Sequence, residues 1–329
     1  MRRALLPLLA VAALLAGCGS SAPSSGDAPK NATLVLDFTP NPVHVGIYTA
    51  LAHHFDTAAG VHLHIIAPSA STDAIRLLQT GRADFAILDI HDLAIARERG
   101  ADVVGILPIV ERPLASVIAA PGVTTPRGLA GRTVGVTGAP SDTAVLDSIV
   151  AGAGGRPQAL KTITIGFNAV SDLLAGKVAA ATAFWNDEGV TLHRRRPGFH
   201  VFRVENYGAP SYPELVVCAG AKRLRSDPAL ARRVVKALVR GYDLALAQPS
   251  AGQHALESQV PGLNHALDTA ELAGLAGALR GPEGRFGVLD TALLRRWAEW
   301  EARFGIVKRP PDVSATFDPA FAPTARAGS

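Results

Sequence analysis

The chain has 329 residues, a net charge of +4 and a hydrophobic content of 48%. That length is sufficient for two lobes with separate cores. The small net charge argues against nucleic acid as a partner, because HRRRPG (193–198) is the main basic cluster and a solvated turn accounts for it. Two cysteines, Cys18 and Cys218, exclude a disulfide-rich scaffold.

The first 17 residues have the pattern of a secretory signal peptide. Two arginines precede the apolar stretch ALLPLLAVAALL (4–15), which is too short to span a bilayer. Leu-Ala-Gly-Cys follows, and residues 18–31 are rich in Ser, Gly and Pro, as in a flexible tether. This layout resembles the bacterial lipobox, which implies a lipid on Cys18 and a protein anchored to the outer face of the plasma membrane. The alternative is an ordinary signal peptide with an incidental cysteine.

Short apolar strands then alternate with helical periodicity. The expected strands of this part are 33–38, 61–68, 84–89, 102–109 and 115–120. Strands separated by helices indicate βαβ units and a mainly parallel sheet, which binds ligands at the carboxyl ends of its strands. Phe38, Ser69 and Asp89 stand at such ends.

The stretch LDFTPNPVHVGIY (36–48) places an aromatic ring, an amide, an imidazole and a phenol after the first strand. We expect Phe38, Asn41, His44 and Tyr48 to converge on a ligand. In this hypothesis Phe38 offers an aromatic face, and Asn41 and His44 bond the polar edge of a ring. The alternative is that Phe38 belongs to the core and His44 caps the following helix.

A second α/β unit is expected after Pro121. Its strands are 131–138, 161–167 and 179–185, and a helix begins near Ser141, a candidate N-cap whose free N–H groups could also bind a ligand. LLQTGRADFAIL (77–88) and LLAGKVAAATAFW (173–185) form a weak internal echo. The echo suggests the same local design in both units. It places Trp185, Asn186 and Glu188 where the first unit has Asp89 and His91.

The rest of the chain returns to the first unit. A strand at 214–221, with Cys218 as a buried thiol, precedes a long helix at 226–249 that has Ser226 as its expected N-cap. Another helix at 291–305 carries Trp297 and Trp300, which we expect in the core. Two chain crossings are predicted, near 118–123 and 213–219. The predicted lobes are 32–120 with 216–329, and 121–215, and they close by hinge motion.

Several segments together resemble the substrate-binding proteins of ABC importers. They are DFTPNPVHVGIY, DAIRLLQTGRADFAI, GLAGRTVGV and DPALARRVVKALVRGYDLALAQP. The most similar branch binds thiamine-pyrimidine precursors and includes the yeast-type thiamine pyrimidine synthases. The resemblance spans residues 32–250 and implies the two-lobed α/β periplasmic-binding-protein fold of class II. This branch usually has Trp where this chain has Phe38, so the stacking on a ligand differs here.

Fourteen residues make up the predicted ligand site. They are Phe38, Asn41, His44, Tyr48, Ser69, Ser71, Asp89, His91, Ser141, Asn168, Trp185, Asn186, Glu188 and Tyr212. A flat heterocycle would lie between Phe38 and Trp185, one from each lobe. We expect no metal, because His62 and His64 alternate on one strand face without a third ligand at metal-binding spacing.

The resemblance allows the synthase activity to be tested at its catalytic positions. Ungapped alignment of ADFAILDIHDLAIARERG puts Leu88 where the synthases have the lysine that holds pyridoxal phosphate, and Asp92 where they have a histidine. A Schiff base needs an amine, which Leu88 lacks. The region near 210–218, PSYPELVVC, lacks the cysteine-rich metal motif. We therefore expect a binding protein without a cofactor, and not an enzyme.

The resemblance implies a monomeric extracytoplasmic protein that delivers a heterocyclic ligand to an ABC permease with a cytoplasmic ATPase. The expected ligand is hydroxymethylpyrimidine or its formylamino form. Riboflavin and a sulfonate are alternatives within this class, and a ligand-sensing domain is the alternative from another class. The candidate loops hold few charged groups, with Arg112 as the obvious cation, so we expect a cleft suited to a neutral ring.

Overall fold

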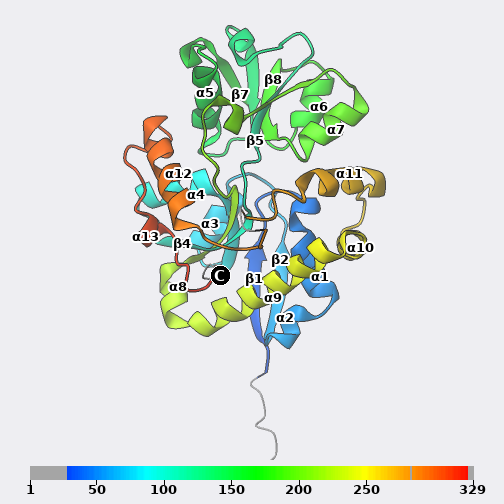
Figure 1. Cartoon of the computed structure of the whole chain (residues 1–329), viewed down its shortest axis with the longest axis vertical. Helices are drawn as coiled ribbons and strands as arrows, with labels where there is room; N and C mark the ends of the chain where they lie inside the picture. The colour runs from blue at the N-terminus through cyan, green and yellow to red at the C-terminus, as the bar shows by residue number, and fades with distance from the viewer. Residues whose placement is uncertain (1–27, 282–283, 325–329) are drawn as a thin grey trace, which may run out of the picture.

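The computed structural model describes residues 28–281 and 284–324. The predictions for the signal peptide and for Cys18 lie outside these residues. The described part of the chain forms two lobes, one above the other in Figure 1, each built on a five-stranded sheet. This is the two-lobed α/β architecture predicted from the alternation of strands and helices. Within these residues, no helix is both long and apolar enough to span a bilayer.

The two sheets have the same strand order. The strands of the first lobe are β1 (Lys30–Val35), β2 (Val61–Ile66), β3 (Phe85–Asp89), β4 (Val103–Val110) and β10 (Leu215–Gly220), in the order β2-β1-β3-β10-β4. Those of the second lobe are β5 (Ala115–Ala119), β6 (Thr133–Val136), β7 (Lys161–Thr164), β8 (Ala180–Phe184) and β9 (His200–Arg203), in the order β7-β6-β8-β5-β9. The internal echo in the sequence ends in β3 and in β8, which occupy the same position in their sheets.

One strand in each sheet runs against the other four. β10 is antiparallel to β3 and β4, and β5 is antiparallel to β8 and β9. Each reversed strand is the first one after a chain crossing. A chain that leaves one lobe at the carboxyl ends of its strands enters the other lobe from the cleft side, so its next strand must run away from the cleft.

The crossings lie earlier in the sequence than predicted. β5 already belongs to the second sheet, so the first crossing is 111–114 and not 118–123. The second is 208–214, before β10, whereas 213–219 was predicted. The predicted lobe boundary at residue 120 is therefore wrong. The apolar run of β5 continues the pattern of β4, and the sequence carries no signal that the two strands belong to different sheets.

Helices cover both faces of each sheet. Those after the strands of the first lobe are α1 (Val45–Ala52), α2 (Phe55–Ala58), α3 (Asp73–Gln79) and α4 (Ile90–Glu98). The second lobe has α5 (Asp142–Gly152), α6 (Ala169–Leu174) and α7 (Glu188–Arg195). The remaining helices are α8 (Ala221–Ser226), α9 (Pro228–Ala247), α10 (Pro249–Gln259), α11 (His265–Leu275), α12 (Thr291–Arg303) and α13 (Val313–Thr316). Short 3-10 turns lie at Pro42–His44, Pro126–Leu129, Pro157–Ala159 and Val204–Tyr207.

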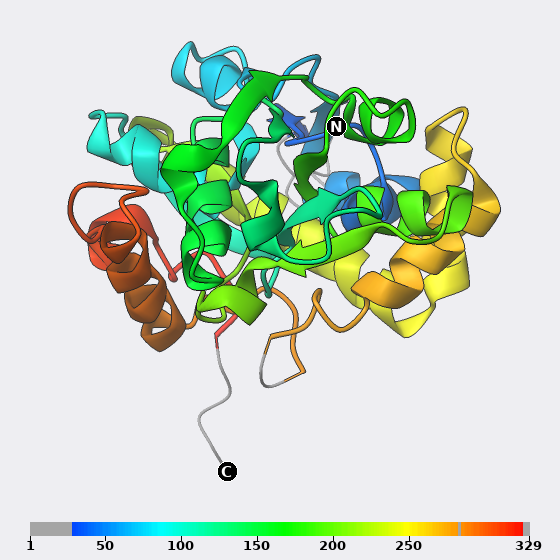
Figure 2. The same cartoon turned by 90° about the horizontal axis from the view of Figure 1, so that it is seen from above.

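The C-terminal helices pack against two sides of the first lobe. Figure 2 shows α12 on one side and α9 to α11 on the other. Trp297 and Trp300 of α12 are buried in a core that continues into the second lobe, and Cys218 lies in the same core. The predictions of buried tryptophans and of a buried thiol are thus confirmed. Asp227, rather than the predicted Ser226, caps α9, because its carboxylate accepts the N–H of Leu230 at 3.2 Å.

Candidate ligand-binding cleft

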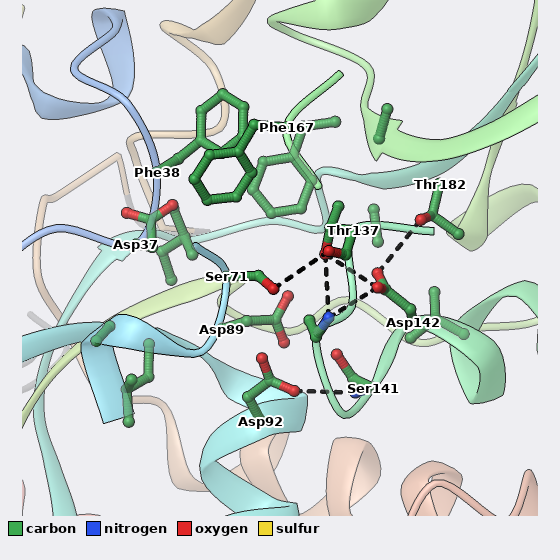
Figure 3. Close-up of a pocket in the computed structure, with 18 of the residues that line it drawn as sticks. Asp37, Phe38, Ser71, Asp89, Asp92, Thr137, Ser141, Asp142, Phe167 and Thr182 are labelled. Carbon is green, nitrogen blue, oxygen red and sulfur yellow. Dashed lines mark hydrogen bonds between the residues drawn. The ribbon is translucent and has the colours of Figure 1, made fainter. Parts of the chain in front are cut away.

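A cavity of about 120 Å³ lies between the lobes (Figure 3). Its walls come from residues at or just beyond the strand ends that face the opposite lobe, including Phe38, Asp89, Thr137 and Phe167. This is where a parallel sheet is expected to bind its ligand. The cavity is smaller than the roughly 300–1,000 Å³ of sites for drug-sized molecules, so it suits a small ligand.

Two phenyl rings form one wall. The centroids of Phe38, from the first lobe, and Phe167, from the second, are 4.4 Å apart at an interplanar angle of 65°. A flat ligand between two rings needs about 7 Å between them, twice the usual carbon–carbon contact distance. Phe38 and Phe167 therefore contact each other edge to face, and together they close one side of the cavity.

The predicted clamp between Phe38 and Trp185 is wrong. The indole of Trp185 turns toward the first crossing and donates to the carbonyl of Pro113 at 3.0 Å. The guanidinium of Arg203 lies over the face of the indole, 3.8 Å from the ring centroid. Trp185 thus packs at the junction of the lobes, outside the cavity lining.

His44 acts on the cavity through Asp37. Nδ1 of His44 accepts the backbone N–H of Asn41 at 3.2 Å, so the ring proton of a neutral imidazole lies on Nε2, which donates to Asp37 at 3.0 Å. His44 is fully buried, whereas Asp37 lines the cavity. His44 thus takes part in capping the following helix, as the alternative stated. Its imidazole also orients Asp37, which lines the cavity.

Carboxyl groups make up half of the polar side chains in the lining. Six acidic residues line the cavity: Asp37, Asp89, Asp92, Asp142, Asp187 and Glu188. Among the described residues that line it there is no Lys, Arg or His, and Arg112 lies outside. The cleft therefore holds more ionisable side chains than predicted: Asp37 follows β1, Asp89 and Asp92 follow β3, Asp142 follows β6, and Asp187 and Glu188 follow β8.

Burial holds several of these carboxyls in their neutral form. Burial, with the neighbouring Asp89, raises the pKa of Asp92 to about 8. Burial, with the neighbouring Asp187, raises the pKa of Glu188 to about 8, and burial raises that of Asp187 to about 6. A neutral carboxyl both donates and accepts a hydrogen bond, so this lining offers both functions near neutral pH.

Asp142 fixes the conformation of the loop 137–141, which forms the cavity wall on the side of the second lobe. Its carboxylate accepts the hydroxyl of Thr137 at 2.9 Å and the backbone N–H groups of Gly138 and Ala139 at 2.7 and 2.9 Å. A second oxygen accepts from Thr182 at 3.2 Å. Four donors thus fix the loop before α5. Ser141 stands at the N-cap position as predicted, but its side chain makes no cap hydrogen bond.

The lobes bond directly to each other on both sides of the cavity. Asp92 of α4 accepts the backbone N–H of Ser141 at 3.0 Å, and Ser71 donates to the carbonyl of Thr137 at 3.4 Å (Figure 3). On the other side, Thr191 of α7 donates to Glu271 of α11 at 3.3 Å. These contacts are those of lobes that have closed on each other.

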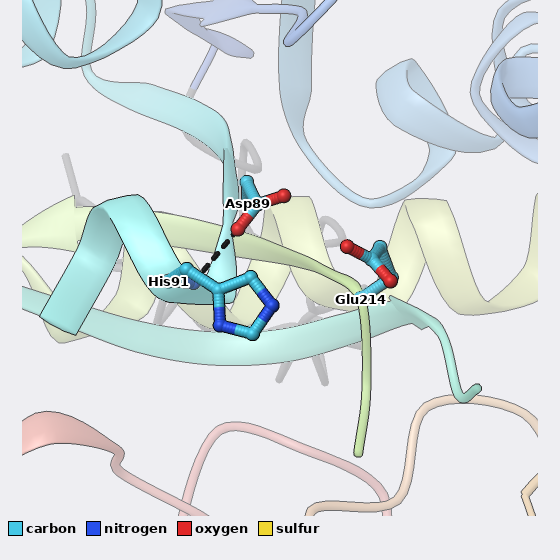
Figure 4. A group of neighbouring side chains, drawn as sticks. All are labelled: Asp89, His91 and Glu214. Carbon is cyan, nitrogen blue, oxygen red and sulfur yellow. Dashed lines mark hydrogen bonds between the residues drawn. The ribbon is translucent and has the colours of Figure 1, made fainter. Parts of the chain in front are cut away.

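A buried network lies behind the cavity and contains His91. Its ring bonds to Glu301 and, at 3.0 Å, to the hydroxyl of Tyr212. Burial lowers the pKa of His91, but Glu301 and Asp89 outweigh this and raise it to about 10. Asp89, His91 and Glu214 each offer one atom that could ligate a metal ion, and these atoms lie within 4.8 Å of one another (Figure 4). Because both ring nitrogens of His91 already have partners, this is a hydrogen-bond network and not a metal site.

Glu214 ties the two crossings together. It belongs to the second crossing, and one of its oxygens accepts the backbone N–H groups of Leu114 and Ala115, the latter at 3.0 Å. Its side chain is fully buried. In the hinge region, the carboxylate of Glu214 therefore links the two segments that join the lobes.

The structure places part of the predicted site in the cavity lining. Six of the fourteen residues line it: Phe38, Asn41, Ser71, Asp89, Ser141 and Glu188. Eight do not: His44, Tyr48, Ser69, His91, Asn168, Trp185, Asn186 and Tyr212. Tyr48 packs in the core of the first lobe, Ser69 donates to Asp73, and Asn168 donates to the carbonyl of Ile165. Asn186 is 1% exposed and lies beside Asp187, which does reach the cavity.

Some of the missed residues had a signal in the sequence, and others had none. Asp37 and Asp187 are direct neighbours of the predicted Phe38 and Asn186, and Phe167 ends a predicted strand as Phe38 does. A strand-end rule applied to both units would have found them. Asp92 and Asp142 lie in the first turns of helices, where acids are ordinary capping residues, so nothing local distinguishes them.

Comparison with known proteins gives consistent matches. A model of the family described as NMT1/THI5 like matches residues 41–252. A formylaminopyrimidine-binding protein of Halalkalibacterium halodurans is 26% identical over 304 residues, covering 90% of this chain and 92% of that protein. The 4-amino-5-hydroxymethyl-2-methylpyrimidine phosphate synthase THI12 of Saccharomyces cerevisiae is 21% identical over 303 residues, covering 87% and 86%.

Solved structures share the fold. The alkanesulfonate-binding protein SsuA of Xanthomonas axonopodis pv. citri, bound to MOPS, superposes with a TM-score of 0.71 over 91% of this chain and 99% of that chain, at 14% identity. The predicted periplasmic-binding-protein architecture is thereby confirmed.

Proposed function

Because the chain belongs to the NMT1/THI5-like family, we propose that it is the solute-binding component of an ABC importer and that its ligand is a thiamine pyrimidine precursor. Hydroxymethylpyrimidine and its formylamino form are the ligands we favour. The relative from Halalkalibacterium halodurans, named a formylaminopyrimidine-binding protein, supports this choice.

The lining of the cavity carries the proposal. An aminopyrimidine presents an amine that donates next to a ring nitrogen that accepts. A neutral carboxyl presents the complementary pair, an accepting carbonyl oxygen and a donating hydroxyl. Asp92 and Glu188, each with a pKa of about 8, are the lining residues suited to that edge, and the rings of Phe38 and Phe167 offer an apolar wall.

The synthases of the same family are a second candidate, which the lining does not favour. Leu88 lines the cavity, and no lysine does so among the described residues. A pyridoxal cofactor would need an amine there to form a Schiff base. The described lining also holds no basic side chain that could pair with the phosphate of such a cofactor.

The direct test is to identify the bound molecule. Protein purified from its native host, then denatured, should release an aminopyrimidine detectable by mass spectrometry. In a thermal-shift panel, hydroxymethylpyrimidine and its formylamino form should raise Tm, and at 100 times Kd the stabilisation is about 2.7 kcal/mol. Riboflavin, taurine and nitrate serve as comparison compounds. A shift with one of these and none with the pyrimidines would refute the proposed ligand.

We also propose that Cys18 anchors the protein to the outer face of the plasma membrane. The sequence Leu-Ala-Gly-Cys with a Ser/Gly/Pro tether supports it. Fatty-acid labelling in the host should mark the wild type and not Cys18→Ala, while the soluble domain of the variant keeps its Tm. Equal labelling of both proteins would show that the anchor is elsewhere or absent.

A further inference from the structure

Four helices begin at the wall of the cavity: α3, α4, α5 and α7. The start of a helix carries free backbone N–H groups and the positive end of the helix dipole, and for this reason it commonly binds anions. The charge preference of the cleft therefore depends on what already occupies these four helix starts.

At each of them, a carboxyl at the helix start accepts backbone N–H groups, within the first turn at α4 and in the preceding loop at α3, α5 and α7. Asp73 accepts from Ser69 and Ala70 at 2.8 and 3.0 Å, Asp89 from His91 at 2.7 Å, Asp142 from Gly138 and Ala139 at 2.7 and 2.9 Å, and Glu188 from Phe184 at 3.0 Å. The N–H of His91 at the start of α4, and those of the loops that lead into the other three helices, are thus bonded within the protein.

At the start of α5, a carboxyl from the opposite lobe also accepts a backbone N–H group. Asp92 lies on α4 in the first lobe, and its oxygen accepts the N–H of Ser141 in the second lobe at 3.0 Å (Figure 3). Asp142 already holds the two preceding N–H groups of the same loop. Asp92 thereby fills the position that an anion at the start of α5 would take when the lobes are together.

We propose that Asp92 determines the charge specificity of the cleft, because it occupies the start of α5 in the closed state and so excludes anionic ligands. An anion would have to displace Asp92 and then lie among Asp89 and Asp142, with no basic side chain among the described residues of the lining. A ligand that donates hydrogen bonds meets acceptors instead. The inference rests on the proposed function only in taking this cavity as the ligand site.

The test removes the side chain and offers anions. Asp92→Ala frees the N–H of Ser141 and deletes one carboxyl, so sulfate, inorganic phosphate and the sulfonate MOPS should bind the variant at least tenfold more tightly than the wild type in calorimetry. Asp92→Ser provides a second variant with a polar side chain, for which we expect the same direction of change. Tm without ligand establishes that each variant is folded.

Asp290→Ala is the matched control. Asp290 caps α12 by accepting the N–H groups of Ala292 and Leu293 at 2.8 and 3.1 Å, and it lies outside the cavity lining. Its removal frees a helix start in the same way, but anion affinity at the cleft should not change. An equal gain in Asp290→Ala would overturn the proposal, and so would folded Asp92 variants that bind anions no better than the wild type.

The wild type provides a check that needs no variant. Sulfate and MOPS should leave its Tm unshifted at concentrations where Asp92→Ala responds, and a wild-type response of equal size would overturn the proposal. Failure of the proposed function has a different signature. If no aminopyrimidine binds the wild type while Asp92→Ala gains anion binding, the ligand assignment is wrong and the role of Asp92 stands.

Discussion

Glu188 shows how a single residue can link proton uptake to ligand binding. Its carboxyl lines the cavity and accepts the N–H of Phe184, and burial with the neighbouring Asp187 raises its pKa to about 8. In open, solvated lobes this side chain would return toward its ordinary value of about 4.3. Closing the lobes near neutral pH therefore takes up a proton.

Affinity should accordingly fall as the pH rises from about 4.3 to about 8, the range between the pKa of Glu188 in the open state and in the closed state. The closed state binds a proton that the open state has released, so low pH favours closure and high pH opposes it. Glu188→Gln mimics the neutral acid, and its affinity for an aminopyrimidine should change less with pH across this range. Calorimetry of both proteins across this pH range measures the difference. Parallel pH profiles would exclude Glu188 as the titrating group.

Phe167 and Trp185 should separate affinity from stability. Phe167→Ala removes a wall of the cavity, and the lost aromatic contact alone is about 0.5–1.5 kcal/mol, so Kd should rise tenfold or more once lost burial is added. Trp185→Ala removes packing at the junction of the lobes and should lower Tm first. Calorimetric Kd and ligand-free Tm are the two readouts. The reverse pattern would place Trp185 in the site and Phe167 in the core.

The close packing of helix α1 against helix α9 requires a glycine at position 46. A Cβ on Gly46 would lie 2.1 Å from the ring of Tyr242, and one on Gly241 would lie 2.0 Å from the carbonyl oxygen of Gly46. The two helices therefore cross with their backbones in contact. Tyr242 also donates to the carbonyl of Val43 at 2.8 Å, which holds the ligand loop against α9.

Gly241→Ala should destabilise the first lobe. The added methyl group meets backbone, which cannot move aside as a side chain can, so we expect a loss of at least 1–3 kcal/mol, roughly the usual cost of overpacking. Gly274→Ala on α11 is the control, because its Cβ would lie 3.9 Å from the indole of Trp185, an ordinary contact. Chemical denaturation measures both variants. Equal free energies of unfolding for Gly241→Ala and the wild type would contradict this packing.

The elements were largely predictable from the sequence, whereas their assignment to lobes was only partly so. Apolar periodicity predicted β1 to β8 and β10 within a few residues. β9 was missed because its sequence, HVFR, begins and ends with basic residues and follows the basic run at 193–198. The site was predictable where it follows strand ends, as for Phe38 and Asp89. It was not predictable for Asp92, because the contact of Asp92 with Ser141 depends on how the two lobes close.

At the scale of the molecule, the crossings at 111–114 and 208–214 carry all the chain that joins the lobes in the described residues. Glu214 connects them through the N–H groups of Leu114 and Ala115. Removing its carboxyl would leave two buried donors without a partner, at about 1–3 kcal/mol each. We therefore expect closure to be a rotation of one lobe relative to the other about these two linked segments.

Ligand should shorten distances between the lobes and leave those within a lobe unchanged. Spin labels at Lys222→Cys and Arg156→Cys report on the two lobes, and labels at Lys222→Cys and Lys236→Cys report on the first lobe alone. The buried Cys218 should not take up label. A saturating aminopyrimidine should shift only the first pair to shorter distances. An unshifted first pair would mean that the lobes do not move on binding.

The position of β10 has a consequence for biogenesis. β10 lies between β3 and β4, yet it follows the whole second lobe in the chain. A polypeptide that emerges with its N-terminus first exposes β1 to β4 before the strand that joins β3 to β4 exists. The second lobe, by contrast, has all five of its strands by residue 203. The lobe that begins first must therefore finish last, and during that interval the edges of β3 and β4 are open to incorrect pairing.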